Sequence, residues 1–215
     1  MPAASRTFTA RHVQLTRAAL AAAAALMITF SSDHSASVGL SVFGGFAIAT
    51  GLVLALAAVF VHPAGRRWPS SIMAAASLVL GMFAGLPPLR SDGLFFGLVI
   101  GWAALTGLVE LVAGIRAKGA DGARDATIIG GAGLLLAVLL ALVPAGFVQE
   151  YTTPQGETTA LTGIILGVGL FGAYAAIVAV FLGIAGLTPA ARKSVQAHAE
   201  TDAGTESLAD HGGDA

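Results

Sequence analysis

Residues 101–119 read GWAALTGLVELVAGIRAKG, and this stretch points to both the solvent and the architecture of the protein. One carboxylate, Glu110, interrupts an apolar run that ends in a basic segment. A helix rises about 1.5 Å per residue and the hydrocarbon core of a bilayer is about 30 Å thick, so about 20 apolar residues can cross it. The run at 93–115 is long enough, and it predicts a transmembrane helix.

A similar phrase occurs earlier in the chain, where residues 45–53 read GFAIATGLV. Six of these nine residues are identical to the residues 56 positions later. Other segments agree in the same way: 77–88 with 133–144 at the offset of 56, and 97–105 with 169–177 at an offset of 72. These offsets predict a two-helix hairpin that is used three times. The leading helix of the first hairpin matches the others only in length and position.

The composition fits a membrane protein, because 56% of the residues are hydrophobic and 11% are charged. Soluble domains carry about 25% charged residues. We therefore predict an all-α membrane protein with six transmembrane helices, built from three tandem helical hairpins. The expected spans are about 17–31, 39–61, 70–88, 93–115, 127–147 and 160–187.

The charges predict the orientation, because cytoplasmic loops carry an excess of Lys and Arg. Ten of the eleven Lys and Arg residues lie before the first span, after the second, after the fourth or in the C-terminal tail, and only Arg90 lies on the other side. Both termini are thus expected in the cytoplasm. The expected domains are a basic N-terminal segment at 1–16, a bundle at 17–187 with hairpins at about 17–61, 70–115 and 127–187, and a disordered acidic tail at 188–215.

The first span has an alternative interpretation as a signal peptide. A basic stretch is followed by ALAAAAALMITF and then by HSAS, which are the parts that such a peptide needs. Cleavage would leave five spans, and the basic loops could then no longer place both ends of the mature chain in the cytoplasm.

Glu110 is the acid within the expected spans, and a charge in the bilayer is costly. One hypothesis is a proton or cation site that faces the bundle interior, with Thr106 one turn earlier as a hydrogen-bond donor to the carboxylate. The other is a structural carboxylate that a neighbouring helix satisfies. The corresponding residues of the other repeats are Leu54 and Leu182, so the architecture itself does not require an acid there.

Two further sets of residues recur at matching positions. Phe46, Trp102 and Tyr174 occupy the same place in the three repeats, and we expect them to pack in the core or to line a ligand site. Gly93, Gly97 and Gly101 recur every four residues on one face of a helix. Small residues at this spacing allow close helix packing, either within the chain or between two copies in a homo-oligomer.

Several classes of function lack support in the sequence. The chain has no cysteine, and its net charge of −1 suggests no nucleic-acid partner. We find no phosphate-binding loop, no zinc-protease motif, no nucleophile elbow and no helical pair of metal-binding histidines. No cofactor, metal or catalytic residue is therefore predicted, and the partner that the sequence indicates is the lipid bilayer.

The stretches GLFFGLVIGWAALTGLVELVAGIRAKG and GGAGLLLAVLLALVP, with three tandem hairpins, resemble the HdeD-like acid-resistance membrane proteins. The resemblance covers about residues 17–187. It implies a six-helix protein of the bacterial inner membrane that is linked to acid or envelope stress, with no catalytic residues to carry over. The first hairpin and the acidic tail depart from the pattern. The leading hypothesis is thus a non-enzymatic stress-associated membrane protein, and the alternative is a small transporter or channel that uses Glu110.

Overall fold

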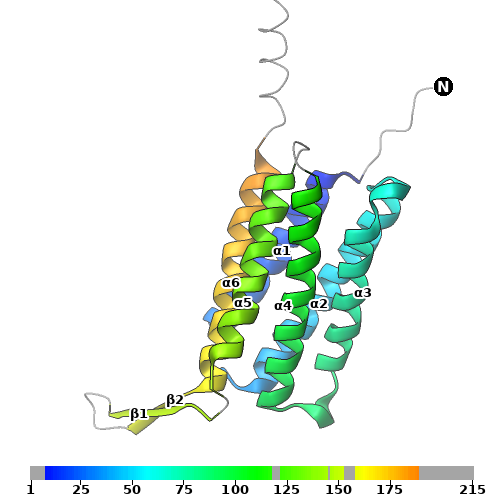
Figure 1. Ribbon diagram of the computed structural model, residues 1–215. Helices are drawn as coiled ribbons and strands as arrows, with labels where there is room; N and C mark the ends of the chain where they lie inside the picture. Colours follow the sequence, from blue (N-terminus) through cyan, green and yellow to red (C-terminus); the bar gives the residue numbers. More distant parts are fainter. Residues whose placement is uncertain (1–7, 118–121, 145, 153–157, 189–215) are drawn as a thin grey trace, which may run out of the picture.

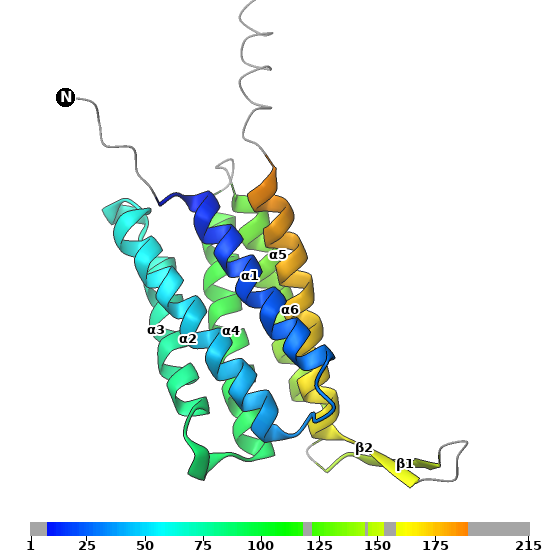
Figure 2. The ribbon, with the colours of Figure 1, turned by 180° about the vertical axis from the view of Figure 1, so that it is seen from behind.

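The six α-helices of the described residues run up and down as a single bundle in the computed structural model (Figures 1 and 2). The structure describes residues 8–117, 122–144, 146–152 and 158–188. The helices are α1 (Ala10–Thr29), α2 (Ala36–Phe60), α3 (Trp68–Ala84), α4 (Asp92–Arg116), α5 (Ala123–Leu142) and α6 (Gly163–Leu187). The acidic tail, apart from residue 188, lies outside the described residues, so the expectation of disorder there stays a prediction.

Five of these helices are long and apolar enough to cross a membrane, which indicates a multi-pass membrane protein. The exception is α3, which is apolar but has 17 residues. The expected span at 70–88 was too long at its end, because Pro87 and Pro88 follow Leu86 directly. The residue before a proline is driven away from helical geometry, and Leu86 indeed has an extended backbone. Two short 3-10 turns, η1 (Ala64–Arg66) and η2 (Pro87–Leu89), flank the helix.

The first helix begins earlier than expected. We placed residues 1–16 outside the bundle, but α1 starts at Ala10 and carries both Arg11 and Arg17. The side chain of Arg11 donates from Nε to the carbonyl oxygen of Gly186, 2.8 Å away at the end of α6. The side chain of Arg11 therefore takes part in the packing of α1 on α6.

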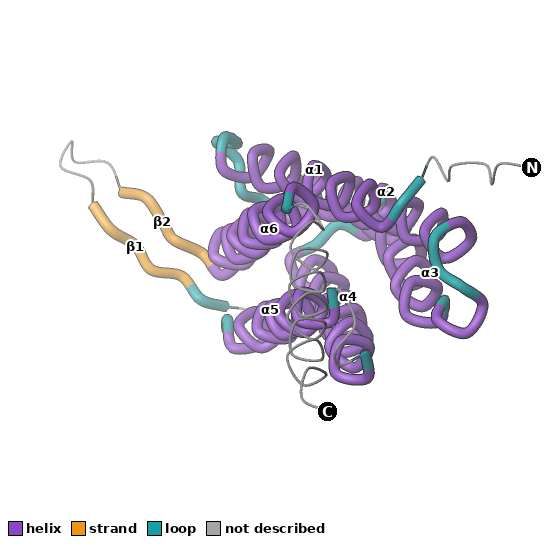
Figure 3. Tube along the Cα trace, turned by 90° about the horizontal axis from the view of Figure 1, so that it is seen from above, coloured by secondary structure: helices purple, strands orange, loops and turns teal. Residues whose placement is uncertain are grey.

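A β-hairpin joins α5 to α6, where the sequence analysis expected only a loop and two helix ends. Strands β1 (Val148–Thr152) and β2 (Thr158–Thr162) pair antiparallel, with Glu150 opposite Ala160. Threonine, valine and tyrosine favour extended structure, and Pro144 follows the end of α5. The hairpin projects beyond the bundle at the end away from the start of α1 (Figures 1 and 3).

Neighbouring helices form a closed ring, in which α6 returns to pack on α1 (Figure 3). The most extensive interfaces are α2 with α3, α4 with α5, and α6 with α1. Each of these pairs joins the second helix of one expected hairpin to the first helix of the next. The two helices within an expected hairpin also touch, but less extensively.

Glycines at corresponding positions allow the close approach at two of these interfaces. A Cβ on Gly51 would lie 3.1 Å from the carbonyl oxygen of Ala74 and 3.1 Å from the nitrogen of Leu78. A Cβ on Gly107 would lie 2.9 Å from the equivalent atoms of Gly130 and Leu134. Each residue of the second set lies 56 positions after its counterpart in the first.

A second pair of corresponding positions relates the third interface to the first. Gly172 of α6 faces Ile28 of α1, and Gly44 of α2 faces Ala84 of α3. Ile28 and Ala84 are 56 residues apart, so the register of α1 follows the offset that its sequence did not reveal.

The helix caps correspond too: the hydroxyl of Ser35 accepts from the nitrogen of Val38, and that of Ser91 from the nitrogen of Leu94.

The glycine stripe on α4 does not pack within the chain. A Cβ on Gly93, Gly97 or Gly101 would meet nothing within 4 Å, and all three residues are exposed. The expectation that this face holds the bundle together was wrong. The face of α4 that packs on α5 instead contains Gly107 and Gly114, about a quarter of a turn around the helix.

Candidate functional site

The carboxylate of Glu110 is paired with Arg17. The guanidinium donates from both terminal nitrogens, Nη1 to Oε1 at 3.0 Å and Nη2 to Oε2 at 3.3 Å. The two side chains are 15% and 12% exposed, so the pair is largely withdrawn from solvent. A bidentate Arg–carboxylate pair is among the stronger and more directional of polar contacts, and this one connects α1 with α4.

The ion pair crosses the interior of the bundle. In the view from above, α1 and α4 lie on different sides of the ring, and each packs mainly on other helices (Figure 3). Arg17 lies about two turns inside α1, counted from Ala10, and Glu110 lies six residues before the end of α4. Both long side chains therefore reach inward at the same level, near the end of the bundle where α1 begins.

An open cavity of about 280 Å³, the outer cavity, leads from this end to the ion pair. Its mouth is formed by the start of α1, the segment after α2 and the start of α5, where Gln14, His62, Arg66 and Asp125 lie. Arg17 and Glu110 line it further in. The site is thus reached from the end of the bundle that carries the basic loops.

Four apolar side chains share the level of the ion pair. They stand at the positions that correspond to Arg17 and Glu110 in the other expected repeats, and all four line the outer cavity: Leu54, Met73, Ile129 and Leu182. Each is at most 5% exposed. One Arg–Glu pair therefore stands in a ring of positions that is otherwise hydrophobic.

A second, much smaller space lies beyond the ion pair. This inner cavity has a volume of about 10 Å³ and shares Arg17 and Glu110 with the outer one. Its polar lining also includes Thr50, Ser77, Trp102, Thr106 and Tyr174. The indole of Trp102 donates to the hydroxyl oxygen of Ser77 at 3.0 Å, which satisfies a buried donor.

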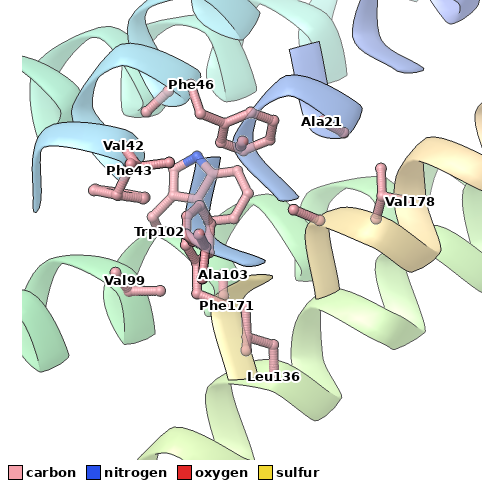
Figure 4. Packing of buried hydrophobic residues seen from close by; sticks show 14 of the residues in the cluster. Ala21, Val42, Phe43, Phe46, Val99, Trp102, Ala103, Leu136, Phe171 and Val178 are labelled. Carbon is pink, nitrogen blue, oxygen red and sulfur yellow. The ribbon is translucent and has the colours of Figure 1, made fainter. Parts of the chain in front are cut away.

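Aromatic side chains close the bundle beyond the inner cavity, on the side away from the ion pair. Trp102 makes edge-to-face contacts with Phe46, Tyr174 and Phe43, at centroid distances of 5.6, 6.0 and 5.7 Å. Phe171 completes the cluster against Phe43 and Phe46 (Figure 4). We expected Phe46, Trp102 and Tyr174 to pack together, and Trp102 contacts both of the others. The cavity that starts at the basic end is therefore closed in mid-bundle.

Thr106 does not hold the carboxylate as expected. Its hydroxyl donates to the backbone carbonyl of Trp102 at 2.7 Å, within its own helix. The expectation that Thr106 donates to Glu110 was wrong, because a threonine in a helix can bond the carbonyl one turn earlier and Arg17 occupies the carboxylate instead. Thr106 still lines the inner cavity.

Arg17 was not predicted as a site residue from the sequence. It was counted among the basic residues that precede the first span, and 93 positions separate it from Glu110. A signal was present, however, because Arg17 shortens an apolar run that would otherwise be longer. An intramembrane acid and an arginine that intrudes into another span are candidates for a pair.

His62 is the titratable group at the mouth of the outer cavity whose pKa is shifted. Burial lowers the pKa of His62 below its usual value, because the charged imidazolium is disfavoured where water is partly excluded. Its backbone carbonyl accepts from Nε of Arg67 at 3.1 Å, which fixes the segment after α2.

Within the described residues, no group of three or more His, Asp or Glu side chains is placed to hold a metal ion. Comparisons of the chain with family models, with curated proteins and with solved structures give no match.

Proposed function

We propose that this chain is a non-enzymatic, six-span protein of the bacterial inner membrane, built from three tandem hairpins and associated with resistance to acid or envelope stress. The repeat is supported by the contacts that recur at the offset of 56, such as Gly51 on Ala74 and Gly107 on Gly130. The sixth span would be α3, which lies alongside the others and whose flanking 3-10 turns add to its length. The HdeD-like resemblance supplies the link to stress.

The observation that carries the proposal is the Arg17–Glu110 pair at the inner end of a one-ended cavity. Protonation of Glu110 would remove its charge and leave Arg17 as an uncompensated cation in a largely buried place. Breaking a buried pair in this way is strongly unfavourable, so the bundle would be driven to a different packing or would admit water. Acidification on the side where the outer cavity opens, which is the cytoplasmic side in this proposal, would therefore change the packing of the bundle.

Other charged and titratable groups surround this carboxylate. They are Arg17 on α1, Tyr174 on α6, His62 and Arg66 after α2, and Asp125 on α5. Arg17 supplies the counter-charge of Glu110 in a ring that is otherwise apolar and consists of Leu54, Met73, Ile129 and Leu182. Loss of the charge on either partner would therefore leave the other without compensation.

The alternative is a small transporter or channel that uses Glu110 as a proton or cation site. The inner cavity favours it, since polar residues continue past the ion pair to Thr50. The aromatic cluster of Trp102 and its neighbours argues against it, because the path ends there. Transport would require these side chains to move aside.

One experiment separates the two functions. A strain without the gene is scored for survival at low pH, and the purified protein is assayed for proton flux in liposomes. Loss of survival without flux supports the stress function, whereas flux that disappears in Glu110→Gln supports the transporter. Full survival of the deletion strain would contradict the link to acid stress.

The partners follow from the outer surface. The lipid bilayer would surround the bundle, with α1 beginning and α6 ending on the cytoplasmic side, where the basic loops lie. The exposed stripe of Gly93, Gly97 and Gly101 is the face on which a second copy of the chain would pack in a homo-oligomer.

A further inference from the structure

We infer that the inner cavity is a binding site for one water molecule, held between Thr50 and the Arg17–Glu110 pair. The cavity is bounded on one side by the ion pair and on the other by the aromatic cluster around Trp102. The acid-stress function does not require such a site. The site depends on the packing around Thr50 and the ion pair, whatever role the protein has in the cell.

The volume of the inner cavity limits which ligand can bind there. A cavity needs about 10–15 Å³ of probe-occupied volume to hold a single water molecule. The inner cavity has about 10 Å³, which is enough for one water and too little for any organic solute. The outer cavity, at about 280 Å³, is large enough for bulk-like water to reach the ion pair from the basic end.

Thr50 supplies the second, independent observation. Its side chain lines the inner cavity, its residue is 3% exposed, and its hydroxyl oxygen has no hydrogen-bond partner among the described residues. A buried hydroxyl without a partner is unfavourable, and such groups in native proteins are usually satisfied by protein or by ordered water. A water in the inner cavity would satisfy it.

The same space offers the further partners that a buried water needs, which number two to four. Glu110 can accept a hydrogen bond beside those from Arg17, since each carboxylate oxygen has two lone pairs. Ser77 accepts the bond from Trp102 and keeps its own proton to donate. Thr50, Glu110 and Ser77 all line the cavity, so donors and an acceptor meet there.

The charges exclude a cation as the preferred ligand. The guanidinium of Arg17 and the carboxylate of Glu110 face the same space and neutralise each other. A sodium or ammonium ion would be repelled by Arg17 at short range, in surroundings where screening is weak. A neutral molecule that both donates and accepts hydrogen bonds, which is water, meets no such penalty.

A comparison of the three repeats explains why Thr50 alone needs this partner. The residues that correspond to Thr50 are Thr106 and Val178, and all three line the inner cavity. Thr106 has its hydroxyl bonded to the carbonyl of Trp102, and Val178 has no hydroxyl. The native valine also shows that the architecture accepts a side chain of that shape at this level.

The test uses Thr50→Val, which removes the hydroxyl and keeps the shape, with Thr106→Val as the matched control. If water is bound, Thr50→Val deletes one of its partners and lowers the melting temperature of the full-length protein in detergent by about 2–4 °C. Thr106→Val should change it less, because the carbonyl of Trp102 keeps its bond within the helix. A higher or unchanged melting temperature for Thr50→Val would overturn the proposal, because removing a truly unpaired buried hydroxyl stabilises the fold.

Equal losses in both variants would also overturn it, because the effect would then belong to the exchange of threonine for valine. Direct observation supplies the second measurement and does not depend on a variant that folds. An experimental map of the native protein, at a resolution that shows ordered solvent, should contain one peak within hydrogen-bonding distance of Thr50 Oγ1 and of a Glu110 oxygen. An empty cavity in such a map would contradict the inference.

Discussion

Arg17 and Glu110 form a bidentate ion pair across the bundle, at positions where the other expected repeats carry methionine or isoleucine and leucine. The two charges are thus a matched exception in a hydrophobic ring. Either charge alone would lack compensation, which explains why an acid was tolerable in a span that seemed too apolar for it. The ion pair therefore determines the expected effect of substitutions at Glu110 on stability.

We expect Glu110→Leu alone to destabilise the protein by about 3 kcal/mol, because it leaves Arg17 buried without a partner. The presence of leucine at positions 54 and 182 is therefore not sufficient to make it harmless. The double variant Arg17→Met/Glu110→Leu, which copies the apolar pairs of the other repeats, should regain the native melting temperature or exceed it. Thermal unfolding in detergent measures both, and a double variant no better than the single one would contradict the pairing.

Glycine substitutions should separate packing faces from exposed ones. Gly107→Ala places a Cβ 2.9 Å from backbone atoms of α5, so we expect a loss of about 1–3 kcal/mol from overpacking. Gly97→Ala meets nothing and should leave the melting temperature of the monomer unchanged. If α4 mediates a homo-oligomer, Gly97→Leu should lower the oligomer fraction in cross-linking while the monomer stays folded. Equal losses of stability for Gly97→Ala and Gly107→Ala would contradict the assigned face.

The stability of the protein should depend on pH through His62. Its pKa is lowered in the folded state, so the unfolded chain binds a proton more readily. The contribution of His62 is therefore fully present above the unfolded pKa of about 6.5 and is lost as the pH falls toward the lower folded value. His62→Gln should make the melting temperature depend less on pH in that window than it does in the native protein. A profile that keeps its slope would exclude His62 as the titrating group.

Tags should report the orientation. A reporter at either terminus is expected in the cytoplasm, and one inserted at residues 153–156 is expected outside, because ten of the eleven Lys and Arg residues lie on the side of the termini. This result also requires α3 to cross the membrane. An external N-terminus, or a mature chain that begins near Ser37, would contradict six spans.

The fold was predictable from the sequence wherever apolar length and repetition carry the signal. The five helices of spanning length follow from the lengths of their apolar runs. The contacts of Trp102 with Phe46 and Tyr174, and the inward position of Glu110, follow from the patterns in α2, α4 and α6. The β-hairpin was missed because its strands are short and border a helix that starts at Gly163, so period-two alternation had little room to show.

The partner of Glu110 and the packing glycines required information that a single sequence hides. Alanine-rich α1 shows no repeat, and its register emerged only from contacts such as Ile28 on Gly172. Gly97 and Gly107 are alike in sequence context, yet one faces away from the chain and the other contacts α5. In a helix that is apolar all round, hydrophobicity does not reveal which face is inside.

The closure of the ring by α6 on α1 has a consequence for how the protein is made. The principal partner of α1 is α6, which follows it along the chain only after α2, α3, α4 and α5, so α1 must wait for this partner while those helices are made. It is also the least hydrophobic of the five spanning helices, with a mean hydropathy of 1.2, and it carries Arg17 from the outset. Until Glu110 arrives, that arginine has its counter-charge only in the lipid headgroups and water at the interface. Biogenesis of this bundle is therefore most vulnerable at its first helix and least so at its last.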